Sequence, residues 1–422
     1  MPISCGIDFG TTNTIAALSQ NKENPELVIL ENDQTTLPSV LFFDVNNNVY
    51  FGREALNLYM NGKTGRCMRS LKRVLGTDLM ALGTSINNHR ESFADILRYF
   101  LQNVKNKTDM MAKCNVENVV LGRPVHFKDY DNEADSRAEN ELRSIAVKIG
   151  FRNIEFQYEP VAAAFAHERK MEKEQLACVI DIGGGTSDFT ILRVGQKLAD
   201  KADRKDDILA NSGVRIGGND FDKDLSLKCF MPTFGYGSLQ GGKTKYDKII
   251  SLPTAPFHMM SEWSSINSMY TYKELNFAKK MLFNAVDQEK VGRFVELIEK
   301  ELGYLLLNVV ENTKIELTTK IKSIIELKFI SDEPKFEVNR LNFENSLNWD
   351  IKRIFEKIDE CVKQAQVKRD DIKLIILTGG STEIPFIKNL IAKYFPNADL
   401  SQENKFSSVG MGLAYDSIRK FL

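Results

Sequence analysis

Two turns rich in glycine and threonine carry the residues that could do chemistry. The first follows Asp8 and reads Gly10-Thr11-Thr12-Asn13; the second follows Asp181 and reads Gly183-Gly184-Gly185-Thr186, with Asp188 beyond it. Glycine lets backbone N–H groups approach a phosphate closely, and threonine hydroxyls add donors beside them. Carboxylates next to such turns suit Mg²⁺, which prefers oxygen ligands and keeps several of its waters. The two turns therefore predict a site for phosphate groups and magnesium.

The segments that contain these turns resemble each other. Residues 3–16 and 176–191 each read as strand, tight turn and strand, with an aspartate three positions after a cysteine. Apolar, β-rich runs on both sides of a tight turn are typical of hairpins. A single copy is more often only a hairpin, whereas two copies favour phosphate binding. The duplication also predicts two related lobes, the second beginning near residue 173.

A third glycine turn lies late in the chain. Residues 374–377 are all apolar, which is typical of a parallel strand covered on both faces. They lead into Gly379-Gly380-Ser381 and then into a helix predicted at 386–394, so backbone amides would lie at a helix start. Other predicted elements are helices at 139–149, 297–316 and 349–366 and a solvated, charged loop at 199–207.

Residues 237–244 match the P-loop pattern but lack its surroundings. A P-loop follows a buried strand and opens a helix. Here Pro232 lies just before the segment and Pro253 follows it, so neither flank fits. We interpret the segment as a loop that binds no phosphate.

The bulk composition limits the classes of function. A chain of 422 residues exceeds the ~250–300 residues that one hydrophobic core supports, so we expect two domains. A net charge of -1 gives no electrostatic reason to expect nucleic acid or an anionic membrane as partner. Six scattered cysteines without a CxxC pair, and a start without a long apolar stretch, predict a reduced, cytoplasmic location.

Four motifs in order resemble the ATPase domain of DnaK-type heat-shock chaperones over nearly the whole chain. They are residues 6–14, 181–188, 217–222 and 379–385. Residues 122–124, 156–163 and 212–220 make the short YegD-type branch the most similar one. The resemblance implies a bilobal actin-like α/β fold, with a mixed sheet flanked by helices in each lobe and a nucleotide cleft between the lobes.

The resemblance also predicts domain bounds. Lobe I would comprise residues 1–172, with a peripheral subdomain at 38–114 and a returning helix at 404–422. Lobe II would comprise residues 173–403, with a peripheral subdomain at 215–319. Because the chain ends at Leu422, we expect no peptide-binding domain.

The same resemblance implies roles for individual residues. ATP or ADP would be bound with Mg²⁺, held largely through water by Asp8 and Asp181. Lys72, Glu159, Asp188 and Thr186 would be catalytic, with Lys72 reaching the terminal phosphate. The residues that would contact the nucleotide are Gly10, Thr11, Thr12, Asn13, Gly183, Gly184, Gly185, Gly217, Gly218, Glu311, Lys314, Ile315, Thr318, Gly379, Gly380, Ser381 and Glu383. Ile315 and Glu383 stand where the family has two arginines that sandwich adenine, so we expect weaker purine binding.

These observations predict a chaperone-related ATPase that depends on magnesium, changes its lobe closure with the nucleotide and acts through a protein partner or client. Three alternatives share the fold and stay open. A nucleotide-sensing module would bind without turnover, and a small-metabolite kinase would need an aspartate base in a substrate pocket. A filament-forming actin relative would assemble with ATP, and fold alone does not separate these functions.

Overall fold

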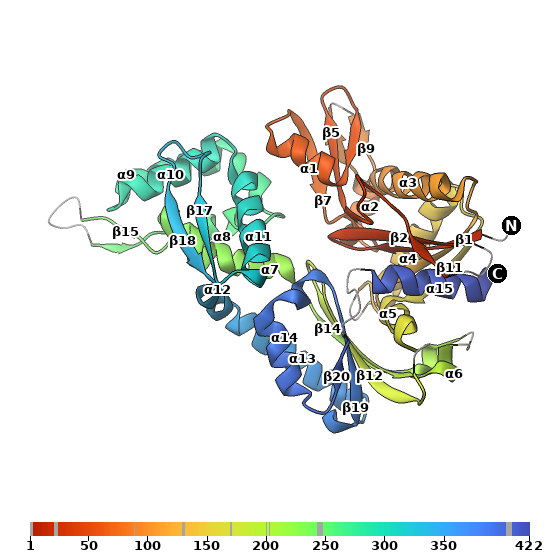
Figure 1. Cartoon of the computed structure of the whole chain (residues 1–422). Helices are drawn as coiled ribbons and strands as arrows, with labels where there is room; N and C mark the ends of the chain where they lie inside the picture. Colours follow the sequence, from red (N-terminus) through yellow and green to blue (C-terminus); the bar gives the residue numbers. More distant parts are fainter. Residues whose placement is uncertain are drawn as a thin grey trace. The chain divides into compact units, whose positions relative to one another are not determined.

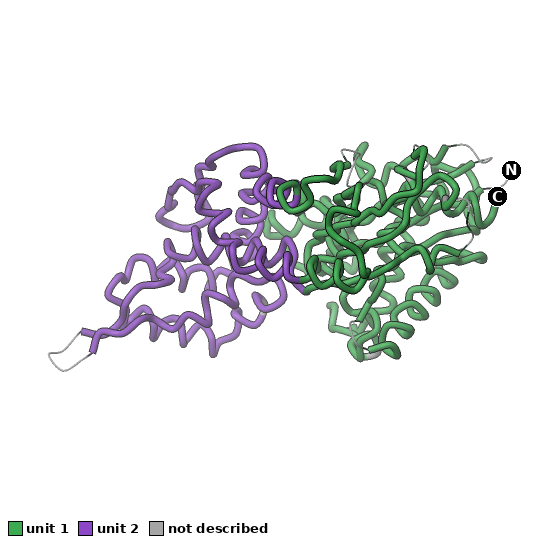
Figure 2. Tube along the Cα trace, turned by 90° about the horizontal axis from the view of Figure 1, so that it is seen from below, with its two compact units in different colours: residues 1–214, 357–382, 392–422 green, residues 215–356, 383–391 purple. Residues whose placement is uncertain are grey.

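The chain forms two compact units (Figure 2). The computed structural model describes residues 3–20, 24–87, 89–128, 131–168, 171–199, 201, 203–242, 248–401 and 407–422. The first unit comprises Met1–Val214, Lys357–Thr382 and Ala392–Leu422, and the second Arg215–Glu356 and Glu383–Ile391. The lobe bounds given above stay a prediction.

The first unit contains two mixed sheets, parts of which are labelled in Figure 1, and their strands follow the same order. In spatial order the first sheet has β11 (Asn153–Tyr158), β10 (Asn118–Arg123), β1 (Ile3–Phe9), β2 (Asn13–Gln20) and β3 (Glu26–Leu27), with β4 (Thr36–Pro38) also paired to β2. The second has β20 (Asp399–Leu400), β19 (Ile372–Thr378), β12 (Gln175–Ile182), β13 (Ser187–Val194) and β14 (Ile208–Val214). Each has an antiparallel run of three consecutive strands, joined at its first strand to two later parallel strands. Both predicted hairpins and the predicted α/β class with mixed sheets are confirmed.

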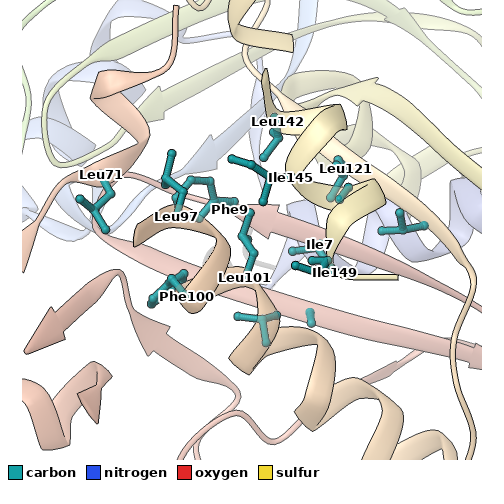
Figure 3. Packing of buried hydrophobic residues seen from close by; sticks show 14 of the residues in the cluster. Ile7, Phe9, Leu71, Leu97, Phe100, Leu101, Leu121, Leu142, Ile145 and Ile149 are labelled. Carbon is teal, nitrogen blue, oxygen red and sulfur yellow. The ribbon is translucent and has the colours of Figure 1, made fainter. Parts of the chain in front are cut away.

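The side chains of β1 alternate between the two faces of the first sheet, and different helices pack on each face. Cys5, Ile7 and Phe9 point to one face, because successive strand side chains alternate. There they join a core cluster with residues of α3 (Phe93–Ala112) and α4 (Asn132–Lys148), including Phe100 and Ile145 (Figure 3). The opposite face packs against α5 (Glu159–Glu168) and α15 (Ser408–Phe421).

Glycines allow α15 to approach its neighbours closely. A Cβ added at Gly6 would lie 2.3 Å from the backbone nitrogen of Ala414, and one at Gly412 would lie 1.8 Å from the carbonyl oxygen of Ala162 in α5. Side chains at either position would force backbone atoms apart. The hydroxyls of Ser4 and Ser417 hydrogen-bond at 2.8 Å, so the last helix is joined directly to the first strand.

A smaller part of the first unit surrounds β5 and precedes α3. Its elements are β5 (Val40–Asp44), β6 (Val49–Phe51), α1 (Gly52–Met60), β7 (Gly65–Arg69), the 3₁₀ turn η1 (Leu71–Val74), α2 (Leu79–Leu82), β8 (Thr84–Ile86) and β9 (His89–Glu91). The unit also contains α6 (Gln196–Ala199), the 3₁₀ turns η2 (Lys205–Asp207) and η7 (Gly380–Glu383, whose last residue belongs to the second unit), and the end of α13 (Asn348–Gln364). No helix among the described residues is long and apolar enough to cross a membrane.

The second unit is mostly helical. Its elements are α7 (Gly218–Leu225), η3 (Ser226–Phe230), η4 (Met231–Phe234), β15 (Leu239–Gln240), β16 (Ile250–Ser251), α8 (Ala255–Met260), η5 (Ile266–Tyr270), α9 (Tyr272–Asn284), α10 (Gln288–Glu299), α11 (Gly303–Thr319), β17 (Lys322–Glu326), β18 (Lys335–Asn339), α12 (Arg340–Ser346), the start of α13 and most of α14 (Pro385–Tyr394). The segment that matches the P-loop pattern, residues 237–244, contains β15, the first strand of the β15–β16 hairpin. Its Lys243 and Thr244 lie outside the described residues.

One prediction of secondary structure is wrong, and one is right only in part. The helix predicted at 297–316 is broken, because α10 ends at Glu299 and α11 begins at Gly303, with Glu301 in the left-handed region at φ 53°. The loop predicted at 199–207 is solvated only in part, because Lys201, Asp203, Lys205 and Asp206 are exposed while Arg204 and Asp207 are not. Arg204 is buried there and pairs with Glu168 at 2.6 Å and Asp207 at 2.6 Å. The helices predicted at 139–149, 349–366 and 386–394 are confirmed as α4, α13 and α14 with shifted ends.

Candidate functional site

A charged cluster of the first unit lies at the ends of its two long hairpins. The ammonium of Lys72 in η1 donates to Oε1 of Glu159, the first residue of α5, at 2.7 Å. Both side chains are largely buried, with 10% and 14% exposed. Asp8 near the end of β1 and Asp181 near the end of β12 interact electrostatically with this pair. Four residues that the sequence analysis placed in one site are thus brought together.

The cluster contains more negative than positive charge. Burial, then repulsion from Glu159, raises the pKa of Asp8 to about 8, although Lys72 opposes this. Burial and the same repulsion raise the pKa of Asp181 to about 6. Burial acts to lower the pKa of Lys72, but the charges of Glu159, Asp8 and Asp181 outweigh it and raise that pKa. Carboxylates that resist ionisation in this way indicate a place for a further cation.

The first glycine turn is held by a serine from a neighbouring segment. The hydroxyl of Ser39 donates to the carbonyl of Gly10 at 2.8 Å and shares a hydrogen bond of 3.0 Å with Thr14. The backbone N–H of Ser39 donates to the carbonyl of Thr12 at 2.7 Å. Thr11, Thr12 and Asn13 are half-buried at this turn. Ser39 was not predicted, and no motif in the sequence identifies it.

The second glycine turn is held from β19. The N–H of Gly183 donates to the carbonyl of Thr186 at 2.9 Å and closes the turn. Thr378 pairs with Asp181 across the parallel strands, and its side chain hydrogen-bonds that carboxylate and lowers its pKa. Gly379 follows at φ +78°, where a Cβ would lie 2.6 Å from Oδ1 of Asp181. Thr378 is the second residue of the site that the sequence analysis missed.

The remaining predicted residues of this turn differ in exposure. Gly183 and Gly184 are half-buried, Gly185 is buried, and the side chain of Thr186 is exposed. The hydroxyl of Ser381 reaches the carbonyl of Gly183 at 3.4 Å, and Gly380 beside it is exposed.

Asp188 lies opposite Asp181 on the paired strand β13. Its Oδ1 lies 2.7 Å from the position that a Cβ at Gly213 would take. Gly213 on β14 therefore makes room for this carboxylate, a role that the sequence analysis did not assign.

The turn that carries Lys72 is fixed at both ends. Ser70 precedes it in the left-handed region at φ 57°, and Leu71 is buried in the core cluster (Figure 3). Gly76 follows, also left-handed at φ +71°. Its N–H donates to Glu141 at 2.7 Å, and its carbonyl accepts from Arg137 at 2.8 Å, both on α4. These contacts fix the turn from which the side chain of Lys72 extends.

The residues expected to contact adenosine belong to the second unit. Lys314 of α11 donates to Oδ2 of Asp222 at 2.8 Å and to the carbonyl of Gly218 at 3.1 Å, so α11 and the start of α7 are joined. Gly217 and Gly218 are buried there. Glu311 and Thr318 share α11 with Lys314 and are half-buried, and the hydroxyl of Thr318 donates to the carbonyl of Ile315 at 2.7 Å.

Ile315 and Glu383 both face solvent. Ile315 is 57% exposed, which is unusual for an apolar residue of its size. Glu383 is exposed at the end of η7. Neither supplies the cation that the adenine-binding positions of the family usually carry.

The donor set suits a cation held through water. Among the described residues, no three acidic, cysteine or histidine side chains are grouped closely enough to hold a metal ion directly. Asp8 and Asp181 are half-buried, with their negative charge only partly balanced by Lys72. Mg²⁺ keeps several waters and takes one or two carboxylates, so these residues fit the ion predicted from the sequence.

Comparison with known proteins identifies the family. The family model described as Hsp70 protein matches residues 4–237 and 285–417. This chain belongs to the Hsp70 family. The Hsp70 family has the bilobal actin-like ATPase fold, in agreement with the repeated sheet order described above. Membership of the YegD-type branch stays a prediction.

Several curated chaperones are similar over most of this Hsp70 chain. It is 27% identical over 421 residues to the chaperone protein DnaK of Thermosipho melanesiensis, 26% over 420 residues to that of Thermosipho africanus, and 24% over 420 residues to that of Thermotoga maritima. Each alignment covers 97% of this chain and 58% of the relative. The chain therefore spans little more than half the length of the relatives that it matches.

Proposed function

We propose that this chain binds ATP with Mg²⁺ and hydrolyses it, as the nucleotide-dependent part of a chaperone-related function. The ion pair of Lys72 with Glu159, beside Asp8 and Asp181 at the ends of two glycine turns, carries this proposal. Nucleotide-driven lobe closure and a protein partner or client belong to the same proposal. They rest on membership of the Hsp70 family.

The proposed mechanism assigns binding and turnover to different groups. Backbone N–H groups of the two turns would bind phosphates, and substitution of side chains leaves them in place. Lys72 would place positive charge where negative charge develops, and Glu159 and Asp188 would orient the attacking water, with the hydroxyl of Thr186 nearby. Asp8 and Asp181 would hold the Mg²⁺ shell, and the ion would neutralise charge on the phosphates.

Single-turnover hydrolysis and calorimetry with ATP and Mg²⁺ test this division. Lys72→Ala should lower the hydrolysis rate by ~10²–10³-fold, the scale for loss of one electrostatic stabiliser, while the dissociation constant for ATP changes much less. Glu159→Ala should also slow hydrolysis, and Asp181→Asn should weaken its dependence on Mg²⁺. Arg66→Ala, at an exposed arginine of β7, is the control and should behave as wild type.

The alternatives give different results in the same assays. Wild-type hydrolysis at the background rate with intact ATP binding would establish a nucleotide-sensing module. Transfer of phosphate to an added metabolite would establish a kinase, and sedimentation with ATP would establish a filament-forming protein. Hydrolysis at the wild-type rate by both Lys72→Ala and Glu159→Ala would show that the assigned roles are wrong.

A further inference from the structure

The turn that carries Lys72 also places a second cation beside the site. Arg73 follows Lys72 in η1. A 3₁₀-helix has 3.0 residues per turn, so successive side chains point about 120° apart. Lys72 reaches Glu159. Arg73 instead reaches the second glycine turn.

The guanidinium of Arg73 lies against Gly185. Its Cζ, Nη1 and Nε lie 3.5, 3.6 and 3.8 Å from the position that a Cβ at Gly185 would take. Three such similar distances show that the flat face of the guanidinium is turned toward this position, at ordinary contact distance from it.

The side chain of Arg73 carries a positive charge that is open to solvent. The side chain is exposed, and no carboxylate of the described part of the chain forms an ion pair with it. Its backbone is held instead: its N–H donates to the carbonyl of Ser70 at 3.1 Å, and its carbonyl accepts from Lys128 at 3.5 Å. The backbone from which the side chain extends is therefore held, and the exposed guanidinium is accessible to an anion.

We propose that Arg73 is a phosphate-binding residue, which holds the phosphate groups of a bound nucleotide against the second glycine turn. This inference rests on the proposed function. A planar guanidinium can donate two parallel hydrogen bonds to phosphate oxygens, and lysine lacks this geometry. Lys72 and Arg73 would then contact the phosphates from two directions, starting from one turn.

Binding calorimetry with Mg²⁺ tests this role without any need for turnover. Arg73→Ala should bind ADP and ATP about 10-fold more weakly, which corresponds to about 1.4 kcal/mol, and should bind adenosine as wild type does. Arg73→Lys, which keeps the charge without the fork, should lose about 3-fold. Arg66→Ala removes an exposed arginine from the same unit and should change neither affinity.

Chemical modification provides a second readout in the wild-type protein. Phenylglyoxal modifies exposed arginines, and mass spectrometry measures the extent at each one. ADP with Mg²⁺ should protect Arg73 several-fold and leave Arg66 unprotected, whereas adenosine should protect neither.

The outcomes separate this inference from the proposed function. Unchanged affinity of Arg73→Ala for ADP, or modification of Arg73 unaffected by ADP, would overturn its role while nucleotide binding by wild type stands. A wild-type protein that binds neither ADP nor ATP would overturn the proposed function, and the role of Arg73 with it. Thermal melting of Arg73→Ala should match wild type, because the exposed side chain forms no ion pair with a carboxylate of the described ranges.

Discussion

The two glycine turns occupy the same place in two sheets of the same strand order, yet their glycines meet different surroundings. A Cβ added at Gly10 would lie 2.3 Å from the carbonyl oxygen of Asn13, so the backbone of the first turn itself excludes a side chain. At Gly183 the nearest atom to an added Cβ is 3.6 Å away, an ordinary contact. The fold therefore requires glycine in the first turn but leaves room for a side chain at Gly183, where the bare backbone would serve the proposed approach of a phosphate.

The largest expected difference concerns the two glycines. Gly10→Ala should lower the free energy of unfolding by about 3 kcal/mol, because the new methyl group overlaps a backbone oxygen that cannot move alone. Gly183→Ala should change it by less than about 1 kcal/mol and should instead weaken ADP binding. Urea unfolding measures the first effect and calorimetry the second. Equal losses of stability in both variants would contradict this comparison.

The two aspartates allow the comparison to be tested by pH in metal-free protein. An aspartate whose pKa is raised by folding holds its proton more tightly in the folded state. Wild-type stability therefore falls as pH rises through the interval between the unfolded and folded pKa values, and is level above it. For Asp8 that interval runs from about 4 to about 8, and for Asp181 from about 4 to about 6.

Replacement of either aspartate by asparagine removes the loss of stability that ionisation of its carboxyl group causes. At pH 9 the free energy of unfolding of Asp8→Asn should exceed that of wild type by about 2 kcal/mol, and this difference should still grow between pH 6 and 8. For Asp181→Asn the difference should reach about 1 kcal/mol and level off near pH 6. Thermal unfolding in EDTA across this pH range measures both. Saturating Mg²⁺ should stabilise wild type and thereby make it more stable than the asparagine variants. Gains that do not depend on pH would contradict the assignment.

The smallest expected difference concerns the serines that contact each turn. Ser39 is 1% exposed and hydrogen-bonds Gly10 and Thr14, so Ser39→Ala should cost about 1.5 kcal/mol of stability. The contact from Ser381 to Gly183 is 3.4 Å long, so Ser381→Ala should cost less than about 0.5 kcal/mol. Urea unfolding of both variants, with wild type as reference, measures the loss of stability that follows from removing each serine hydroxyl.

The sequence predicts the hairpins well because each is encoded within a few residues. The alternating apolar residues, the aspartate and the glycine turn all lie between residues 3 and 16 or between 176 and 191. The residues that hold the turns were missed for the opposite reason. Ser39 and Thr378 are ordinary polar residues, and their role arises only when β4 and β19 pair with other strands.

The break in the helix and the buried part of the charged loop escaped prediction for similar reasons. Apolar periodicity continues through the break near Glu301, so the left-handed residue that separates α10 from α11 leaves no local signal. The charged residues near Arg204 predict a solvent-exposed loop. The local pattern does not reveal that Glu168, 36 positions away, supplies a buried partner for Arg204. No local pattern identifies Arg73 either, since its contact with Gly185 spans more than a hundred residues.

The contact of α15 with β1 has a consequence for the order of folding. Ser4 and Ser417 are 413 positions apart, and the close approach of Gly6 to Ala414 has a similar separation. The first sheet therefore lacks the cover of α15 on one face until residues 408–421 have been synthesised. Contacts so distant in sequence slow folding and leave apolar surface exposed meanwhile. A member of a chaperone family would thus itself pass through an aggregation-prone state during its synthesis.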